Sequence, residues 1–94
     1  MILLLLAGCL GYTEGQAQRG ELHCAWLDTC GELDSVGFSD VAACADAAAA
    51  QPYDDADCPD YDGAAMAACL QSYEDAIDAA SCDVDFAEAC LVCG

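Results

Sequence analysis

Nine cysteines give this chain its widest choice of chemistry, because a thiol can form a disulfide, bind a metal or take part in redox exchange. Eight of them follow residue 20: Cys24, Cys30, Cys44, Cys58, Cys69, Cys82, Cys90 and Cys93. An even number of cysteines in a short chain favours a framework of disulfide bonds, here up to four. The remaining cysteine, Cys9, stands apart from this set near the start of the chain.

Spacing alone does not decide which cysteines pair, because eight cysteines allow about a hundred connectivities. A repeated pattern nevertheless favours two local bridges. Ala-Ala-Cys occurs at 42–44 and again at 67–69, and each copy is followed by an Ala-rich segment and a further cysteine. We therefore expect Cys44–Cys58 and Cys69–Cys82, with the other four pairing among themselves: Cys24, Cys30, Cys90 and Cys93.

Two other interpretations of the cysteines are weaker. Cys90 and Cys93 have the spacing of a redox CxxC motif, but such a motif begins a helix, whereas this one follows a helix at the end of the chain. His23 and Cys24 could contribute to a zinc site, yet zinc sites usually combine two short-spaced pairs and only one CxxC is present. We expect structural disulfides, with His23 on the surface of a helix.

The segment over residues 54–63 is the best candidate for a metal site. Five carboxylates there could supply oxygen ligands to Ca²⁺: Asp54, Asp55, Asp57, Asp60 and Asp62. The pattern departs from an EF-hand, because Asp60 stands where glycine is required and no glutamate closes the loop. The alternative is a solvated acidic loop that ends in a helix N-cap. We expect no obligatory cofactor, with Ca²⁺ as the one candidate.

The chain lacks a recognisable catalytic set. His23 is its only histidine, and no serine has a His–Asp context. Carboxylates are so frequent that a pair of them does not indicate a glycosidase, and short helices in a small domain hardly build a sugar-sized cleft. We expect a protein that is not an enzyme.

Charge is the second extreme of the composition. The formal net charge is −17, and the only Lys or Arg is Arg19. Binding to nucleic acid is excluded, because it depends on Lys and Arg that neutralise phosphates. An anionic membrane surface should also repel this chain. The expected partners are cations, either metal ions or a basic protein surface.

Cys9 and the residues before it indicate a targeting signal. An apolar run over residues 2–6 leads into Leu6-Ala7-Gly8-Cys9, which resembles the lipobox of bacterial lipoproteins. The resemblance covers residues 2–9 and implies that residues 1–8 are a signal peptide, and that Cys9 carries diacylglycerol and palmitate after cleavage. The run is too short to span a membrane. A basic segment normally precedes it, so we expect the signal peptide to be truncated at its N-terminus. Leu10 favours the outer membrane, with the side it faces left open.

The rest of the chain indicates a tether and a helical domain. Residues 10–20 combine glycines with polar residues, so residues 9–20 are expected to form a lipidated cysteine and a flexible tether. From Glu21, apolar residues recur at steps of three and four, which predicts helices. Ser39, Asp62 and Asp85 are expected N-caps. We expect residues 21–94 to form an all-α domain, a small bundle of three to four short helices held together by disulfides.

Together these features favour a non-catalytic bacterial lipoprotein of the cell envelope. It would be tethered to the membrane through the lipid on Cys9 and present an acidic, disulfide-rich domain for envelope structure or protein interaction. Two alternatives remain open from the sequence. One is a module that binds a divalent cation such as Ca²⁺, and the other is a secreted inhibitor or toxin-like module.

Overall fold

The computed structural model describes residues 10–93, so the expected signal peptide and the lipidation site Cys9 lie outside the described residues. Within residues 10–93 the chain is helical and contains no strand. Its elements are α2 (Tyr12–Thr29), η1 (Asp34–Val36), α3 (Val41–Ala49), η2 (Asp55–Asp57), α4 (Gly63–Asp78) and α5 (Phe86–Ala89). The predicted class, a small all-α bundle held by disulfides, is confirmed.

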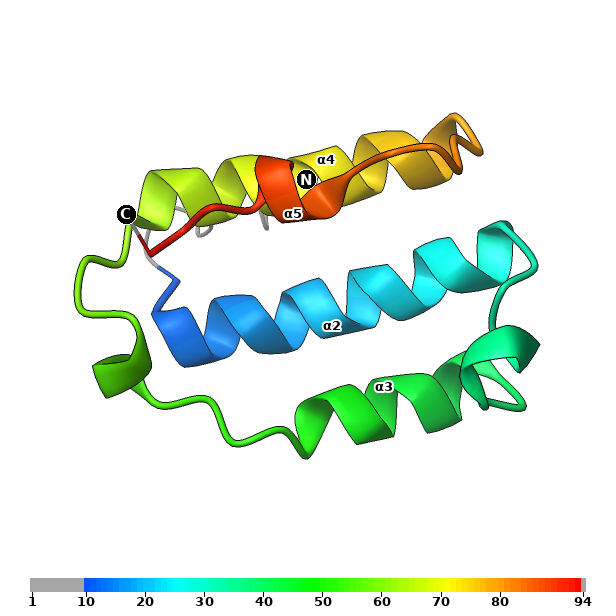
Figure 1. Ribbon diagram of the computed structural model, residues 1–94, viewed down its shortest axis with the longest axis horizontal. Coiled ribbons are helices and arrows are strands. Elements are labelled where there is room, and N and C mark those ends of the chain that lie inside the picture. The colour runs from blue at the N-terminus through cyan, green and yellow to red at the C-terminus, as the bar shows by residue number, and fades with distance from the viewer. Residues whose placement is uncertain (1–9, 94) are drawn as a thin grey trace.

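The longest helix, α2, forms the centre of the bundle. It packs against α4 on one side and against α3 on the other, and the short α5 packs onto α4 (Figure 1). Helices α2 and α4 run in the same direction. Helix α3, which lies between them in the sequence, runs in the opposite direction (Figure 1). None of the helices in the described part of the chain combines the length and apolar character needed to cross a bilayer.

The start of α2 corrects one expectation. Residues 12–20 were expected to be part of a flexible tether, but they form the first half of α2. Two kinds of contact hold this half in place. The ring of Tyr12 is buried edge-on against Tyr53 and Tyr61. Gly15 and Gly20 let neighbouring helices approach closely, because a Cβ atom on either would lie within 2.8 Å of a side chain of α4 or α3. Tertiary packing, which a polar sequence window does not reveal, therefore stabilises this segment.

The main core lies between α2 and α4 and is closed by the C-terminal segment. Met66, Cys69 and Tyr73 of α4 are almost completely inaccessible to solvent. The Tyr73 ring stacks on Phe86 of α5 with 3.7 Å between centroids. Trp26 lies edge-on to Phe86 at 4.9 Å and donates a hydrogen bond from Nε1 to the Ser81 carbonyl oxygen at 2.7 Å. These aromatic contacts supply apolar burial that a chain rich in alanine otherwise lacks.

Aspartates begin most of the helices. Asp40, Asp62 and Asp85 are the N-caps of α3, α4 and α5, and each side chain accepts a hydrogen bond from a backbone N–H in the first turn. Asp62 and Asp85 were predicted, whereas the prediction of Ser39 for α3 is wrong by one residue. A carboxylate accepts the same hydrogen bond as a serine hydroxyl and also interacts favourably with the positive end of the helix dipole.

All eight cysteines after Cys9 form disulfides, but the expected pairing is wrong. The bonds are Cys24–Cys44, Cys30–Cys82, Cys58–Cys93 and Cys69–Cys90. Cys24–Cys44 joins α2 to α3, and Cys30–Cys82 joins the segments that follow α2 and α4. The expected bridges Cys44–Cys58 and Cys69–Cys82 would link neighbours along the chain. The bundle instead bridges elements that lie side by side in space.

This connectivity predicts the outcome of disulfide mapping. We expect the intact mass of the oxidised domain to be lower than that of the reduced domain by eight hydrogens, because four disulfides form. Partial proteolysis without reduction, followed by mass spectrometry, should recover Cys24 linked to Cys44 and Cys69 linked to Cys90. Recovery of a Cys44–Cys58 peptide as the main species would contradict the fold. Each bridge should stabilise the domain by about 3–4 kcal/mol through its effect on the unfolded chain.

The close approach at Gly20 predicts an unusual response to substitution. Replacing glycine by alanine inside a helix normally stabilises it by about 0.5–1 kcal/mol. In Gly20→Ala the new Cβ would lie 2.6 Å from the Cβ of Ala48, so α2 and α3 must move apart. We expect a loss of about 1–3 kcal/mol in the free energy of unfolding, measured in urea with the disulfides intact. The exposed neighbour substitution Glu21→Ala should change it by less than about 0.5 kcal/mol.

Candidate functional site

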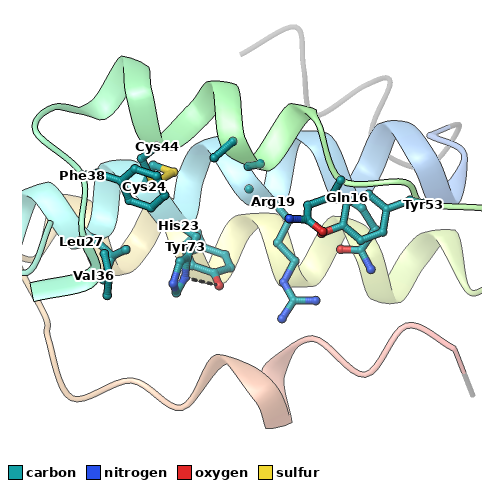
Figure 2. A pocket seen from close by; sticks show the side chains of 14 residues that line it. Gln16, Arg19, His23, Cys24, Leu27, Val36, Phe38, Cys44, Tyr53 and Tyr73 are labelled. Carbon is teal, nitrogen blue, oxygen red and sulfur yellow. Dashed lines mark hydrogen bonds between the residues drawn. A yellow bond between two sulfur atoms is a disulfide. The ribbon is translucent and has the colours of Figure 1, made fainter.

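A groove of about 560 Å³ opens along α2 and is the candidate site of this domain. Residues from one face of α2 form its floor, including Gln16, Gly20 and Leu27. Ala47 and Ala48 of α3 form one wall, Tyr73 of α4 contributes to the other, and the loop before α3 closes one end (Figure 2). Small side chains on α3 and Gly20 on α2 leave this space open. Its volume falls in the range of small-molecule sites, about 300–1,000 Å³.

The only histidine of the chain lies in this groove. His23 was expected on the surface, but it is half-buried and its Nδ1 atom forms a 2.9 Å hydrogen bond with the Tyr73 hydroxyl (Figure 2). Burial, and to a smaller extent the charge of Arg19, lower the pKa of His23 below its usual 6.5. Burial raises the pKa of Tyr73, and the nearby Arg19 opposes that shift. Both side chains are therefore neutral at pH 7, and they satisfy each other's polar atoms.

The only cation of the chain also lines the groove. Arg19 was expected in a flexible tether, but it lies in α2, one turn before His23 (Figure 2). No ion pair with an acidic side chain of residues 10–93 neutralises its guanidinium group, although the chain carries 18 acidic residues. One turn earlier, Gln16 lines the groove and is only 9% exposed. Arg19 and Gln16 thus place hydrogen-bond donors on one face of α2.

The CxxC segment is not a redox pair in this structure. Cys90 is bonded to Cys69, and Cys93 is bonded to Cys58. The two thiols of the motif thus belong to different structural disulfides. Cys24 is likewise engaged with Cys44, so it offers no ligand beside His23 for a zinc ion.

The acidic segment does not assemble a metal centre in the structure. All five of its carboxylates are exposed: Asp54, Asp55, Asp57, Asp60 and Asp62. The side chains of Asp54 and Asp62 accept hydrogen bonds from backbone N–H groups at the starts of η2 and α4. Within residues 10–93, no three His, Cys, Asp or Glu side chains lie close enough together to hold a metal ion. These aspartates shape the loop and cap helices.

Comparison with known proteins adds no assignment. Neither a protein-family model, a curated protein nor a solved structure matches the chain. The residues of the groove therefore have to be interpreted from their own geometry and chemistry.

Sequence reasoning missed the groove because its polar residues lay in the expected tether. Gln16 and Arg19 were assigned to a segment without structure, so their positions seven and four residues before His23 were not combined with those of the helix. One signal was available: extending the helix backward places Gln16, Gly20, His23 and Leu27 at steps of four, three and four. This spacing puts them on one face.

The environment of His23 predicts a measurable titration. Because His23 is the only histidine, its ring protons give unambiguous nuclear magnetic resonance signals. We expect a midpoint below 6.5 at about 0.15 M NaCl, where distant carboxylates are screened. Arg19→Gln should move the midpoint up but leave it below 6.5, since burial is the larger cause.

The same shift has a consequence for folding. The unfolded chain binds a proton at His23 at higher pH than the folded chain. The contribution of His23 to the free energy of unfolding is therefore fully present above about pH 6.5. It is lost as the pH falls from there through the lower folded pKa. His23→Asn should lack this component of the pH dependence in urea unfolding. A wild-type midpoint at or above 6.5 would show that His23 is not buried as described.

Proposed function

We propose that this chain is an exported, non-catalytic domain that a lipid on Cys9 holds at a bacterial membrane. There it presents an acidic, disulfide-rich surface for envelope structure or for a protein partner with a basic surface. The observation that carries this proposal is the use of the cysteines. The eight that follow Cys9 are all paired with one another.

Complete pairing supports export, because disulfides persist in oxidising compartments and are rare in the reducing cytosol. It also supports a separate role for Cys9. The four bridges use every cysteine of the described residues, so the thiol of Cys9 is not needed for the framework. The Leu6-Ala7-Gly8-Cys9 pattern supplies a chemistry for that thiol, which is attachment of diacylglycerol.

The charge distribution supports the type of partner. Every acidic residue of the described chain is exposed except the half-buried Glu74. The carboxylates are spread over all elements and the loops between them, so repulsion from anionic lipids acts in any orientation. A lipid anchor would hold such a domain at a membrane despite this repulsion. A basic protein surface is the complementary partner.

The two alternatives from the sequence gain no specific support. A Ca²⁺ module would bring several carboxylates to one point, whereas the loop aspartates point to backbone donors and solvent. An inhibitor or toxin-like module would be secreted without an anchor, which leaves the lipobox unexplained. The anchored interaction domain accounts for both the lipobox and the cysteine parity.

Lipidation of Cys9 is the testable core of this proposal. The full chain, preceded by a short Lys-containing segment, is expressed in a Gram-negative host with labelled palmitate. We expect label in a membrane-fraction protein whose mass fits cleavage before Cys9 and addition of lipid. Cys9→Ser should carry no label and keep residues 1–8. Gly11→Ser, a change of similar size just after the lipobox, should be labelled like the wild type. A wild-type protein that is soluble, unlabelled and uncut would overturn the proposal.

A further inference from the structure

We propose that the groove along α2 binds a free medium-chain fatty acid. Its carboxylate lies at Arg19 and Gln16, and its hydrocarbon chain follows α2 toward Leu27 and Phe38. This inference concerns the groove alone and does not depend on lipidation of Cys9 or on the acidic surface.

The polar end of the groove contains a largely buried glutamine whose amide has no hydrogen-bond partner among the described residues. Gln16 is nine-tenths buried and lines the groove, and its amide makes no hydrogen bond to another residue of the described chain. No fully buried side-chain N or O atom of the described residues lacks a partner, so the Gln16 amide retains contact with solvent. A ligand oxygen in the groove can accept a hydrogen bond from this amide.

Arg19 favours a ligand with a negative charge. It lies three residues after Gln16, so the two side chains share one face of α2. Its guanidinium group forms no ion pair within residues 10–93, in a chain where carboxylates outnumber cations 18 to 1. Guanidinium binds a carboxylate with two parallel hydrogen bonds. The only Lys or Arg of the chain thus lines the groove beside the Tyr73 hydroxyl, where it can bind an anion from outside.

The rest of the groove suits a hydrocarbon chain. Beyond Arg19 its lining includes Gly20, the Cys24–Cys44 disulfide, Leu27 and Phe38, with Ala47 on α3. The ring of Phe38 packs against the smaller core cluster and lies beside this disulfide in Figure 2. Helical rise places Leu27 about 12 Å along the axis from Arg19, which matches an extended chain of roughly ten carbons at ordinary single-bond geometry.

The central polar pair does not compete for the ligand. His23 and Tyr73 bond to each other through Nδ1 and the hydroxyl group, so these two polar atoms are already engaged. The lining therefore has one polar end and a largely apolar remainder. That arrangement matches a molecule with a single charged head and an unbranched tail.

The net charge of −17 restricts the ligand to one with little charge of its own. At low ionic strength the carboxylates around the domain repel any anion. At about 0.15 M salt the Debye length is about 8 Å, so distant carboxylates are screened while a direct contact with Arg19 persists. Binding of the fatty acid should therefore strengthen as NaCl rises from about 10 to 150 mM. Simple attraction of an anion to a basic surface has the opposite salt dependence.

Titration with decanoate tests the proposal. The oxidised full chain carrying Cys9→Ser, which prevents lipidation, is followed by amide and His23 nuclear magnetic resonance signals at 0.15 M NaCl. We expect saturable shifts at groove residues and a higher titration midpoint for His23, since the bound carboxylate offsets the charge of Arg19. Decanol has the same hydrocarbon chain without the charge. It should bind at least about tenfold more weakly than decanoate, which is the scale of one charge-assisted hydrogen bond.

Matched variants locate the head of the ligand. Arg19→Gln should weaken decanoate binding about tenfold or more. Ala64→Glu changes the net charge by the same amount at an exposed position of α4 outside the groove, and it should bind within about twofold of the parent. Ala47→Leu fills the groove from α3 and should also reduce binding, while circular dichroism verifies that each variant is folded.

The contrary outcomes are equally specific. Equal affinities for decanoate and decanol, or an unchanged affinity in folded Arg19→Gln, would overturn the proposal. So would the absence of saturable shifts with decanoate up to about 1 mM. A peptide with an apolar C-terminal residue that binds where decanoate does not would also reject it, and would assign the groove to a protein partner.

Discussion

The scarcity of cations is the constraint on which the rest of this structure depends. With Arg19 as the only Lys or Arg, the fold has almost no means of offsetting its carboxylates through ion pairs. The arrangement of helices increases the difficulty, because α2 and α4 run in parallel and no basic residue lies in the last turn of either (Figure 1). Cys30–Cys82 joins the chain just beyond these two ends. Covalent bonds and aromatic stacking thus oppose the mutual repulsion of the carboxylates, which ion pairs can hardly reduce here.

The predicted fold class follows from local chemistry that a sequence displays directly. Helical spacing of apolar residues, with aspartates at Asp62 and Asp85, determined where α4 and α5 begin. The disulfide pairing could not be obtained in the same way, because it depends on which helix faces meet across the bundle. Cys24 bonds to Cys44 because Gly20 has no side chain, which lets Ala48 of α3 pack directly against the backbone of α2. That approach is a property of two distant segments together, and neither segment reveals it alone.

The candidate site was predictable only in part. His23 stood out as a single histidine, but its burial depends on Tyr73, fifty residues away in sequence. Gln16 and Arg19 were hidden in a window whose composition is typical of a linker. Their helical structure depends on contacts of Tyr12 with Tyr53 and Tyr61 rather than on local preference. The acidic loop had the more conspicuous composition, yet its aspartates act mainly as helix caps and solvated surface.

The position of Arg19 also bears on how this domain resists proteolysis. A protease that cleaves after lysine or arginine has one sequence target in the whole chain, the peptide bond between Arg19 and Gly20. That bond lies within α2, and Gly20 is packed against Ala48, so the extended conformation required for cleavage is not accessible without unfolding. Cleavage there would leave all four disulfides in the C-terminal fragment, because every bonded cysteine follows Gly20. The composition that gives the chain a single basic side chain thereby makes it resistant to proteases that cleave after lysine or arginine.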